Sequence, residues 1–206
     1  MSYKTVEREA QDEFTEQRSR FIGYVKPVTT EEEALAFINE KRQIHWDAKH
    51  NVYAYSLRSG NLRRYSDDGE PHGTAGMPTL DVILKSDVTD VVVVVTRYFG
   101  GILLGTGGLV RAYTKGARIA LEAGGIITME SCAVAELECD YSQYGKIASL
   151  IPSEGGVIDD TAFSDRVRIE YHIPADRLDG FSKQLTDLTG GTVCTESIGE
   201  QYFRMP

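Results

Sequence analysis

The sequence has 206 residues but only three cysteines, Cys132, Cys139 and Cys194, and none of them forms a CxxC pair. An odd number without paired spacing argues against both a disulfide framework and a zinc ribbon. No apolar run approaches the roughly 18 residues that a membrane-spanning helix needs. The first residues alternate charged with apolar side chains, unlike a signal peptide. We therefore expect reduced thiols and a cytoplasmic protein without a membrane partner.

Standard catalytic and metal-binding motifs are also missing. The sequence contains no GxSxG elbow for a nucleophilic serine, and the cysteines have no motif context. His45 and His50 lie five residues apart, lack the HExxH pattern and have no evident third ligand. We therefore expect no metal ion, no cofactor and no recognisable catalytic residue, and a binding protein is favoured over an enzyme.

The charge of the chain is acidic and unevenly spread. The net charge is −9, but residues 131–206 carry 6 basic and 13 acidic side chains, a net of −7, whereas residues 1–130 carry 16 and 18, a net of −2. Residues 41–64 carry six basic side chains against one acid, and residues 91–121 carry four against none. Because the local field decides where an anion docks, we expect anionic partners on the first part of the chain.

The apolar pattern predicts two α+β domains. Five valines and a threonine at 91–96 indicate a central strand buried on both faces. The other elements expected before residue 130 are strands at 20–28, 51–57 and 62–66 and helices at 31–44, 79–84 and 109–123. After residue 130 the order is strand, helix, strand, strand, helix, strand, at 132–140, 141–151, 156–163, 166–173, 175–188 and 192–203. That order is the ferredoxin-like split unit, so we place the domains at 1–130 and 131–206.

The segment 97–113 is the first candidate binding site. It reads RYFGGILLGTGGLVRAY, and its glycines lie between the buried strand and a helix, at Gly100, Gly101, Gly105, Gly107 and Gly108. Glycine lets the backbone approach a ligand closely, and a helix that begins near these residues presents unpaired N–H groups to an anion. The combination suits a phosphate group.

Positive side chains extend this candidate site. Arg111, Lys115 and Arg118 recur at i, i+4 and i+7 and so share one helix face. Together with Arg97, and with Arg63 and Arg64 nearby, they would form a surface for phosphate or nucleic acid. The alternative is a tight strand-to-helix turn beside a solvated basic face.

The glycines themselves match no standard phosphate-binding fingerprint. Val110 stands where a GxGxxG motif has its third glycine, and Thr106 replaces the lysine of a Walker loop. The chemistry of the segment therefore stays open.

A second loop, at 67–78, is a possible further site. It reads DDGEPHGTAGMP and concentrates Asp68, Glu70 and His72 beside Asp67. Clustered carboxylates can hold Mg²⁺ or Ca²⁺, although the spacing is not that of an EF-hand, and Glu70 or His72 could exchange protons. The alternatives are a turn-forming loop with exposed acids and a loop that packs beside the glycine segment.

Three stretches together resemble the Impact family, in its bacterial YigZ-like branch. They are RFIGYVKPV from Arg20, DGEPHGTAGMP from Asp68, and TRYFGGILLGTGGLVRAY from Thr96. The resemblance covers the whole chain. It implies a first domain like the second domain of ribosomal protein S5 and an appended ferredoxin-like domain, similar in arrangement to the last two domains of the translocating elongation factor. It also implies a link to translation, and it carries over no catalytic residue.

Three functions follow from these observations. The first is a nucleic-acid- or ribosome-associated factor in the regulation of translation, because aromatic side chains accompany the two basic stretches and could stack on bases. The second is a nucleotide- or phosphate-binding phosphotransferase of GHMP-kinase-like architecture. The third is a protein-interaction module that binds a translation component. RNA, a ribosome component and a translation-associated protein are thus the expected partners.

Overall fold

The computed structural model describes residues 2–204, and the chain divides into two compact units. The first contains residues 3–128 and the second residues 129–204 together with Ser2. Each unit combines helices with one sheet, so the predicted α+β class is confirmed. Within the described residues, no helix is both long and apolar enough to cross a membrane.

The first unit is built on an antiparallel sheet with the order β2-β3-β6-β4-β5. Its strands are β2 (Ala10–Glu16), β3 (Ser19–Pro27), β6 (Val91–Tyr98), β4 (His50–Leu57) and β5 (Leu62–Ser66). The valine-rich strand β6 lies at the centre, as its two buried faces predict. A short strand β1 (Ser2–Val6) is not part of this sheet, and an isolated bridge joins its Lys4 to Val88. A 3-10 turn, η1 (Ser59–Asn61), connects β4 to β5.

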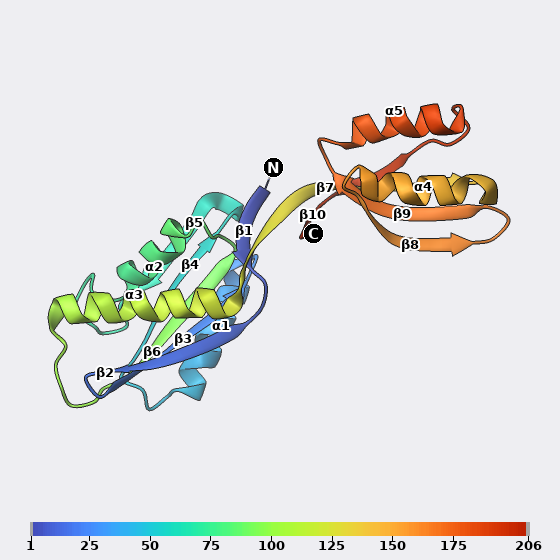
Figure 1. Ribbon diagram of the computed structural model, residues 1–206. Helices are drawn as coiled ribbons and strands as arrows, with labels where there is room; N and C mark the ends of the chain where they lie inside the picture. Colours follow the sequence, from blue (N-terminus) through green and yellow to red (C-terminus); the bar gives the residue numbers. More distant parts are fainter. Residues whose placement is uncertain (1, 205–206) are drawn as a thin grey trace. The chain divides into compact units, whose positions relative to one another are not determined.

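Helices cover both faces of this sheet (Figure 1). They are α1 (Glu31–Ile44), α2 (Gly76–Lys85) and α3 (Gly105–Gly124). The side chains of Val91, Val93 and Val95 pack with α2 and α3, whereas Val92 and Val94 pack with α1. The alternation of β6 therefore divides the apolar core into two layers, and it fixes α3 on the face opposite α1.

Local sequence signals predict the first residue of α1 correctly but not those of α2 and α3. Helix α1 begins as predicted, because Thr30 accepts the amide of Glu33 and Glu33 returns a bond to the cap backbone. Helices α2 and α3 begin three and four residues earlier than the predicted 79 and 109, at Gly76 and Gly105. Glycine has a low helix propensity, so the sequence pattern predicts the starts of both helices too late in the chain.

The second unit has the predicted ferredoxin-like order. Its elements are β7 (Ile126–Cys139), α4 (Tyr141–Ser153), β8 (Val157–Phe163), β9 (Val167–Pro174), α5 (Leu178–Thr189) and β10 (Glu196–Arg204). Strands pair antiparallel in the order β10-β7-β9-β8. Ile147 and Ile151 of α4 and Phe181 and Leu185 of α5 join the strands in one core. Cys132 and Cys139 are buried, Cys194 is exposed, and none of the three forms a disulfide bond within the described residues.

Candidate functional site

The glycine segment connects the end of β6 to the first turn of α3. Gly100 and Gly101 lie in the loop, and Gly105, Gly107 and Gly108 lie in the first turn of the helix. A Cβ atom at Gly100 would lie 2.0 Å from the carbonyl carbon of Arg18, so the loop packs directly on the turn between β2 and β3. Gly105 has a φ of +68°, which side-chain-bearing residues rarely adopt. These glycines shape the start of α3.

The first turn of α3 keeps its backbone N–H groups available. The cap residue, Leu104, makes no side-chain capping bond, and the first turn contains no acidic residue. The first four N–H groups of a helix have no partner inside the helix. The start of α3 is therefore electropositive.

Arg97 lies on β6 and is buried, so it does not join the exposed basic residues of α3. It is only 5% exposed, and its Nη1 lies 2.7 Å from Oε1 of Glu70. Tyr113 of α3 donates its hydroxyl to the same Oε1, also at 2.7 Å. Burial, and then the charge of Glu70, raise the pKa of Tyr113, so the phenol stays protonated and donates. This buried cluster ties β6, the 67–78 loop and α3 together.

His50, at the start of β4, lies next to this cluster. It is 8% exposed, and its Nδ1 lies 2.7 Å from the carbonyl oxygen of Asp68. A carbonyl oxygen only accepts, so Nδ1 carries the hydrogen of this bond. Nε2 lies 3.7 Å from Oε1 of Glu70, too far for a hydrogen bond.

The two aspartates of the 67–78 loop are engaged by the protein. Asp67 accepts the backbone N–H groups of Gly73, Ala75 and Gly76. Burial would raise the pKa of Asp67, but these hydrogen bonds outweigh it and hold the pKa below its usual value. This carboxylate fixes the start of α2, which explains why the helix begins earlier than its sequence predicts.

The possible loop site is not assembled around one point. Asp68 accepts the N–H of Asn51 at 2.6 Å and pairs with Arg42 at 2.9 Å. Glu70 faces Arg97, and the His72 side chain is 96% exposed. Across residues 2–204, no group of three or more potential metal-ligating side chains is found. The loop packs beside the glycine segment through Glu70.

A pocket of about 360 Å³ opens where these features meet, and we call it the α3 pocket. Its lining residues come from the start of β4, the 67–78 loop, the end of β6 and the start of α3. They are Lys49, His50, Glu70, Pro71, Arg97, Phe99, Leu103, Leu104, Gly105, Thr106 and Leu109. Sequence reasoning misses Lys49, His50, Phe99 and Leu103 as one group, because no periodic pattern joins loops from three parts of the chain.

The exposed cations of α3 form a continuous stripe. Arg111, Lys115 and Arg118 are all exposed, and we call them the α3 crest. None of the three forms an ion pair with any residue in the described part of the chain. Lys115 Nζ lies 4.3 Å from the centre of the Phe14 ring. The crest is thus an un-neutralised positive surface, as the helical spacing predicts.

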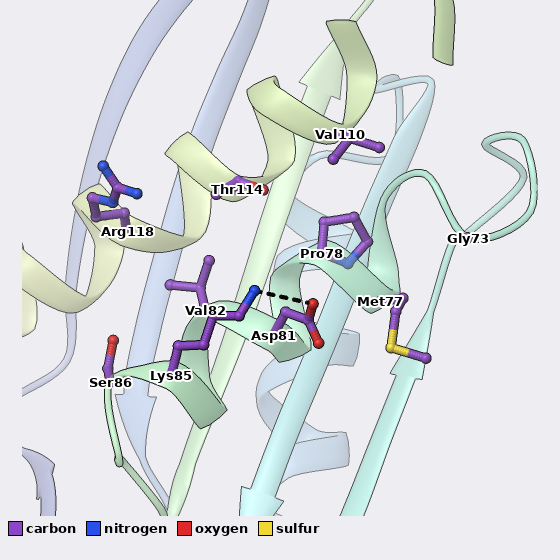
Figure 2. A pocket seen from close by; sticks show the side chains of 10 residues that line it. All are labelled: Gly73, Met77, Pro78, Asp81, Val82, Lys85, Ser86, Val110, Thr114 and Arg118. Atoms are coloured by element: carbon purple, nitrogen blue, oxygen red, sulfur yellow. Dashed lines mark hydrogen bonds and ion pairs between the residues drawn. The ribbon is translucent and has the colours of Figure 1, made fainter. Parts of the chain in front are cut away.

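A groove of about 490 Å³ runs between α2 and α3 (Figure 2). Arg118, Thr114 and Val110 line it from α3. On the α2 side, Lys85 pairs with Asp81 at 3.5 Å, so these two charges offset each other. Arg118 therefore supplies the uncompensated charge where the groove meets the α3 crest.

Arg63 and Arg64 lie apart from the crest. Both are exposed on β5, at one edge of the sheet. Helix α2 packs over β4 and β5, whereas α3 packs over β2, β3 and β6. Arg63 and Arg64 therefore do not extend the α3 crest, whereas Lys49 of the same basic stretch lines the α3 pocket.

The aromatic side chains are mostly structural. Tyr113 and Tyr55 are buried, and Phe99 is 42% exposed. The sole tryptophan, Trp46, is 83% exposed just after α1. Stacking on bases is thus open to Phe99 and Trp46 more than to the buried tyrosines.

Comparison with known proteins identifies the family. Residues 17–121 match the Impact N-terminal domain, and residues 137–192 match a domain of unknown function (DUF1949). The chain is 37% identical over 191 residues to the IMPACT family member YvyE of Bacillus subtilis, covering 92% of this chain and 88% of the relative. The chain belongs to the Impact family. The IMPACT family member YigZ of Escherichia coli is 36% identical, with 89% of this chain and 91% of the relative covered.

The Impact family likeness extends to solved structures and to eukaryotes. A crystal structure titled as that of a hypothetical protein aligns with a TM-score of 0.61 at 33% identity, over 97% of this chain and 98% of that one. Protein IMPACT of Mus musculus is 38% identical over 96 residues, which are 44% of this chain and 30% of the relative. The predicted resemblance is thus confirmed.

Proposed function

We propose that this Impact family protein is an RNA-binding factor of the translation apparatus and that the α3 crest is its RNA-binding surface. The observation that carries the proposal is three exposed cations without ion pairs on one helix, Arg111, Lys115 and Arg118. They lie in a stretch, residues 91–121, that contains no acidic residue. Phosphates dock on such surfaces with release of counterions.

The distribution of charge supports one direction of approach. Residues 131–206 carry a net charge of −7, so the second unit repels a phosphate backbone. RNA therefore approaches the first unit, and the acidic unit is free to contact a protein of the same assembly. The resemblance of the first unit to a ribosomal-protein domain favours ribosomal RNA as the target.

Affinity purification with and without nuclease tests the proposal. Tagged protein is purified from a lysate, and the co-purified RNA and ribosomal proteins are measured. The variant Arg111→Ala/Lys115→Ala should lose the RNA. The control Lys146→Ala/Lys183→Ala, which removes the same charge from exposed positions of the second unit, should retain it.

Two results would contradict RNA binding by α3. One is RNA recovery that is the same with both variants. The other is ribosomal association that survives complete nuclease digestion, which would identify a protein-interaction module instead.

A further inference from the structure

The α3 pocket combines a charged floor with an apolar wall. Its volume of about 360 Å³ is within the range of small-ligand sites, roughly 300–1,000 Å³. It lies at the start of α3, next to the α3 crest but with different lining residues. The pocket is thus a separate place at which a ligand could be held.

The floor retains a buried polar atom that the protein does not use. Arg97 is 5% exposed, and its Nε has no hydrogen-bond partner in residues 2–204. His50 is 8% exposed; its Nδ1 bonds to the carbonyl oxygen of Asp68, and its Nε2 lies 3.7 Å from Oε1 of Glu70. Buried polar atoms are normally hydrogen-bonded, so the unpaired Nε of Arg97 at the pocket indicates a ligand.

The rim of the pocket is positive. The charges of Arg97 and Glu70 offset each other at 2.7 Å. Lys49 is exposed at the rim and forms no ion pair with a described residue. Gly105 and Thr106 contribute the uncapped start of α3, which carries about half a positive charge. The net field favours an anionic group such as a phosphate.

The wall of the pocket is apolar and accessible. Leu103 is 85% exposed and Phe99 is 42% exposed, and both line the pocket. The Nζ of Lys49 lies 5.9 Å from the centre of the Phe99 ring. A ligand with a flat aromatic ring can stack that ring on Phe99 while a phosphate group of the same ligand reaches Lys49.

We propose that the α3 pocket binds one mononucleotide unit, free or at the end of an RNA chain. The phosphate lies at Lys49 and the first turn of α3, and the base lies against Phe99 and Leu103. A sugar hydroxyl forms a hydrogen bond with Nε2 of His50. For the end of an RNA chain this inference rests on the proposed function, whereas for a free nucleotide it stands alone.

Calorimetric titration of the whole chain tests the pocket. Adenosine 5′-monophosphate should bind about tenfold more tightly than adenosine, as expected for one charge-assisted phosphate contact. It should also bind more tightly than inorganic phosphate. Lys49→Ala and Phe99→Ala, both exposed positions, should each weaken binding severalfold, whereas Lys146→Ala, at an exposed position of the second unit, should leave it unchanged.

Short RNAs with and without a terminal phosphate distinguish the two sources of the nucleotide. Preference for the phosphorylated end, lost in Lys49→Ala, assigns the pocket to RNA ends; binding of the free nucleotide alone assigns it to metabolites. The inference is overturned if neither probe binds at millimolar concentration, if inorganic phosphate binds as tightly, or if Lys49→Ala changes nothing. Loss of RNA binding in Arg111→Ala/Lys115→Ala bears only on the proposed function, so the two failures are distinguishable.

Discussion

Replacing Glu70 by glutamine should strongly destabilise the first unit. The carboxylate is 4% exposed, and it neutralises the guanidinium of Arg97, which is 6% exposed. Glutamine keeps the size and the acceptor for the Tyr113 hydroxyl but removes the charge. The guanidinium is then buried without a countercharge, and breaking such a pair costs about 3–5 kcal/mol.

An exposed ion pair provides the matched control for Glu70→Gln. Glu13 pairs with Arg20 at 2.6 Å, but the two side chains are 50% and 52% exposed. Solvent screens this pair, so Glu13→Gln should cost less than about 1 kcal/mol. The free energy of unfolding is measured by urea denaturation for both variants, at low and at high salt. High salt should weaken the exposed pair and leave the effect at Glu70 nearly unchanged.

The double variant Glu70→Leu/Arg97→Met separates lost charge from lost packing. Removing both charges should recover part of the stability that Glu70→Gln loses, because apolar pairs often replace buried ion pairs at little cost. Equal losses of stability in Glu70→Gln and Glu13→Gln would contradict a buried-charge effect, as would a double variant that is less stable than Glu70→Gln.

Three other predictions follow from single contacts. Asp67→Asn should lower the free energy of unfolding by about 1–2 kcal/mol at pH 7. Because the pKa of Asp67 in the folded protein is below its ordinary 3.8, the stabilisation by this carboxylate is complete well above pH 4 and is lost as the pH falls through the folded pKa. Urea denaturation of both proteins should therefore show a smaller difference in stability at pH 3 than at pH 7. Gly100→Ala should lower the free energy of unfolding by about 2 kcal/mol because its Cβ would overlap the Arg18 backbone. Gly107→Ala, whose Cβ would have only the Arg111 side chain within 4 Å, should leave the stability unchanged or raise it. Equal effects of the two substitutions in thermal denaturation would contradict this account. Residues 131–206 alone should unfold cooperatively by circular dichroism, since that segment supplies one closed core; a non-cooperative melt would argue against a domain boundary at 130.

Local chemistry accounts for what the sequence predicts well. The central position of β6 follows from its valines, and the start of α1 follows from Thr30 and Glu33. Strand β2, by contrast, is not predicted. It is an edge strand in which only Ala10 and Phe14 are half-buried, so its apolar alternation is weak.

The contacts that build the site are long-range and could not be predicted. Arg97 and Glu70 are 27 residues apart, and Tyr113 is 43 residues from Glu70. A basic residue in a basic stretch suggests a solvated cation, but the position of Arg97 on the central strand buries it. The crest residues follow from helical spacing alone, because one helix face requires no knowledge of the tertiary structure.

The central claim is that the α3 crest binds RNA, and a salt titration tests it most directly. Binding of a labelled single-stranded RNA is measured by fluorescence anisotropy from low to physiological salt. Three phosphate contacts predict a slope of log K against log salt of about −2, and Arg111→Ala/Lys115→Ala should reduce it to about −0.7. Absence of binding at low salt, or an unchanged slope in the variant, would contradict the account.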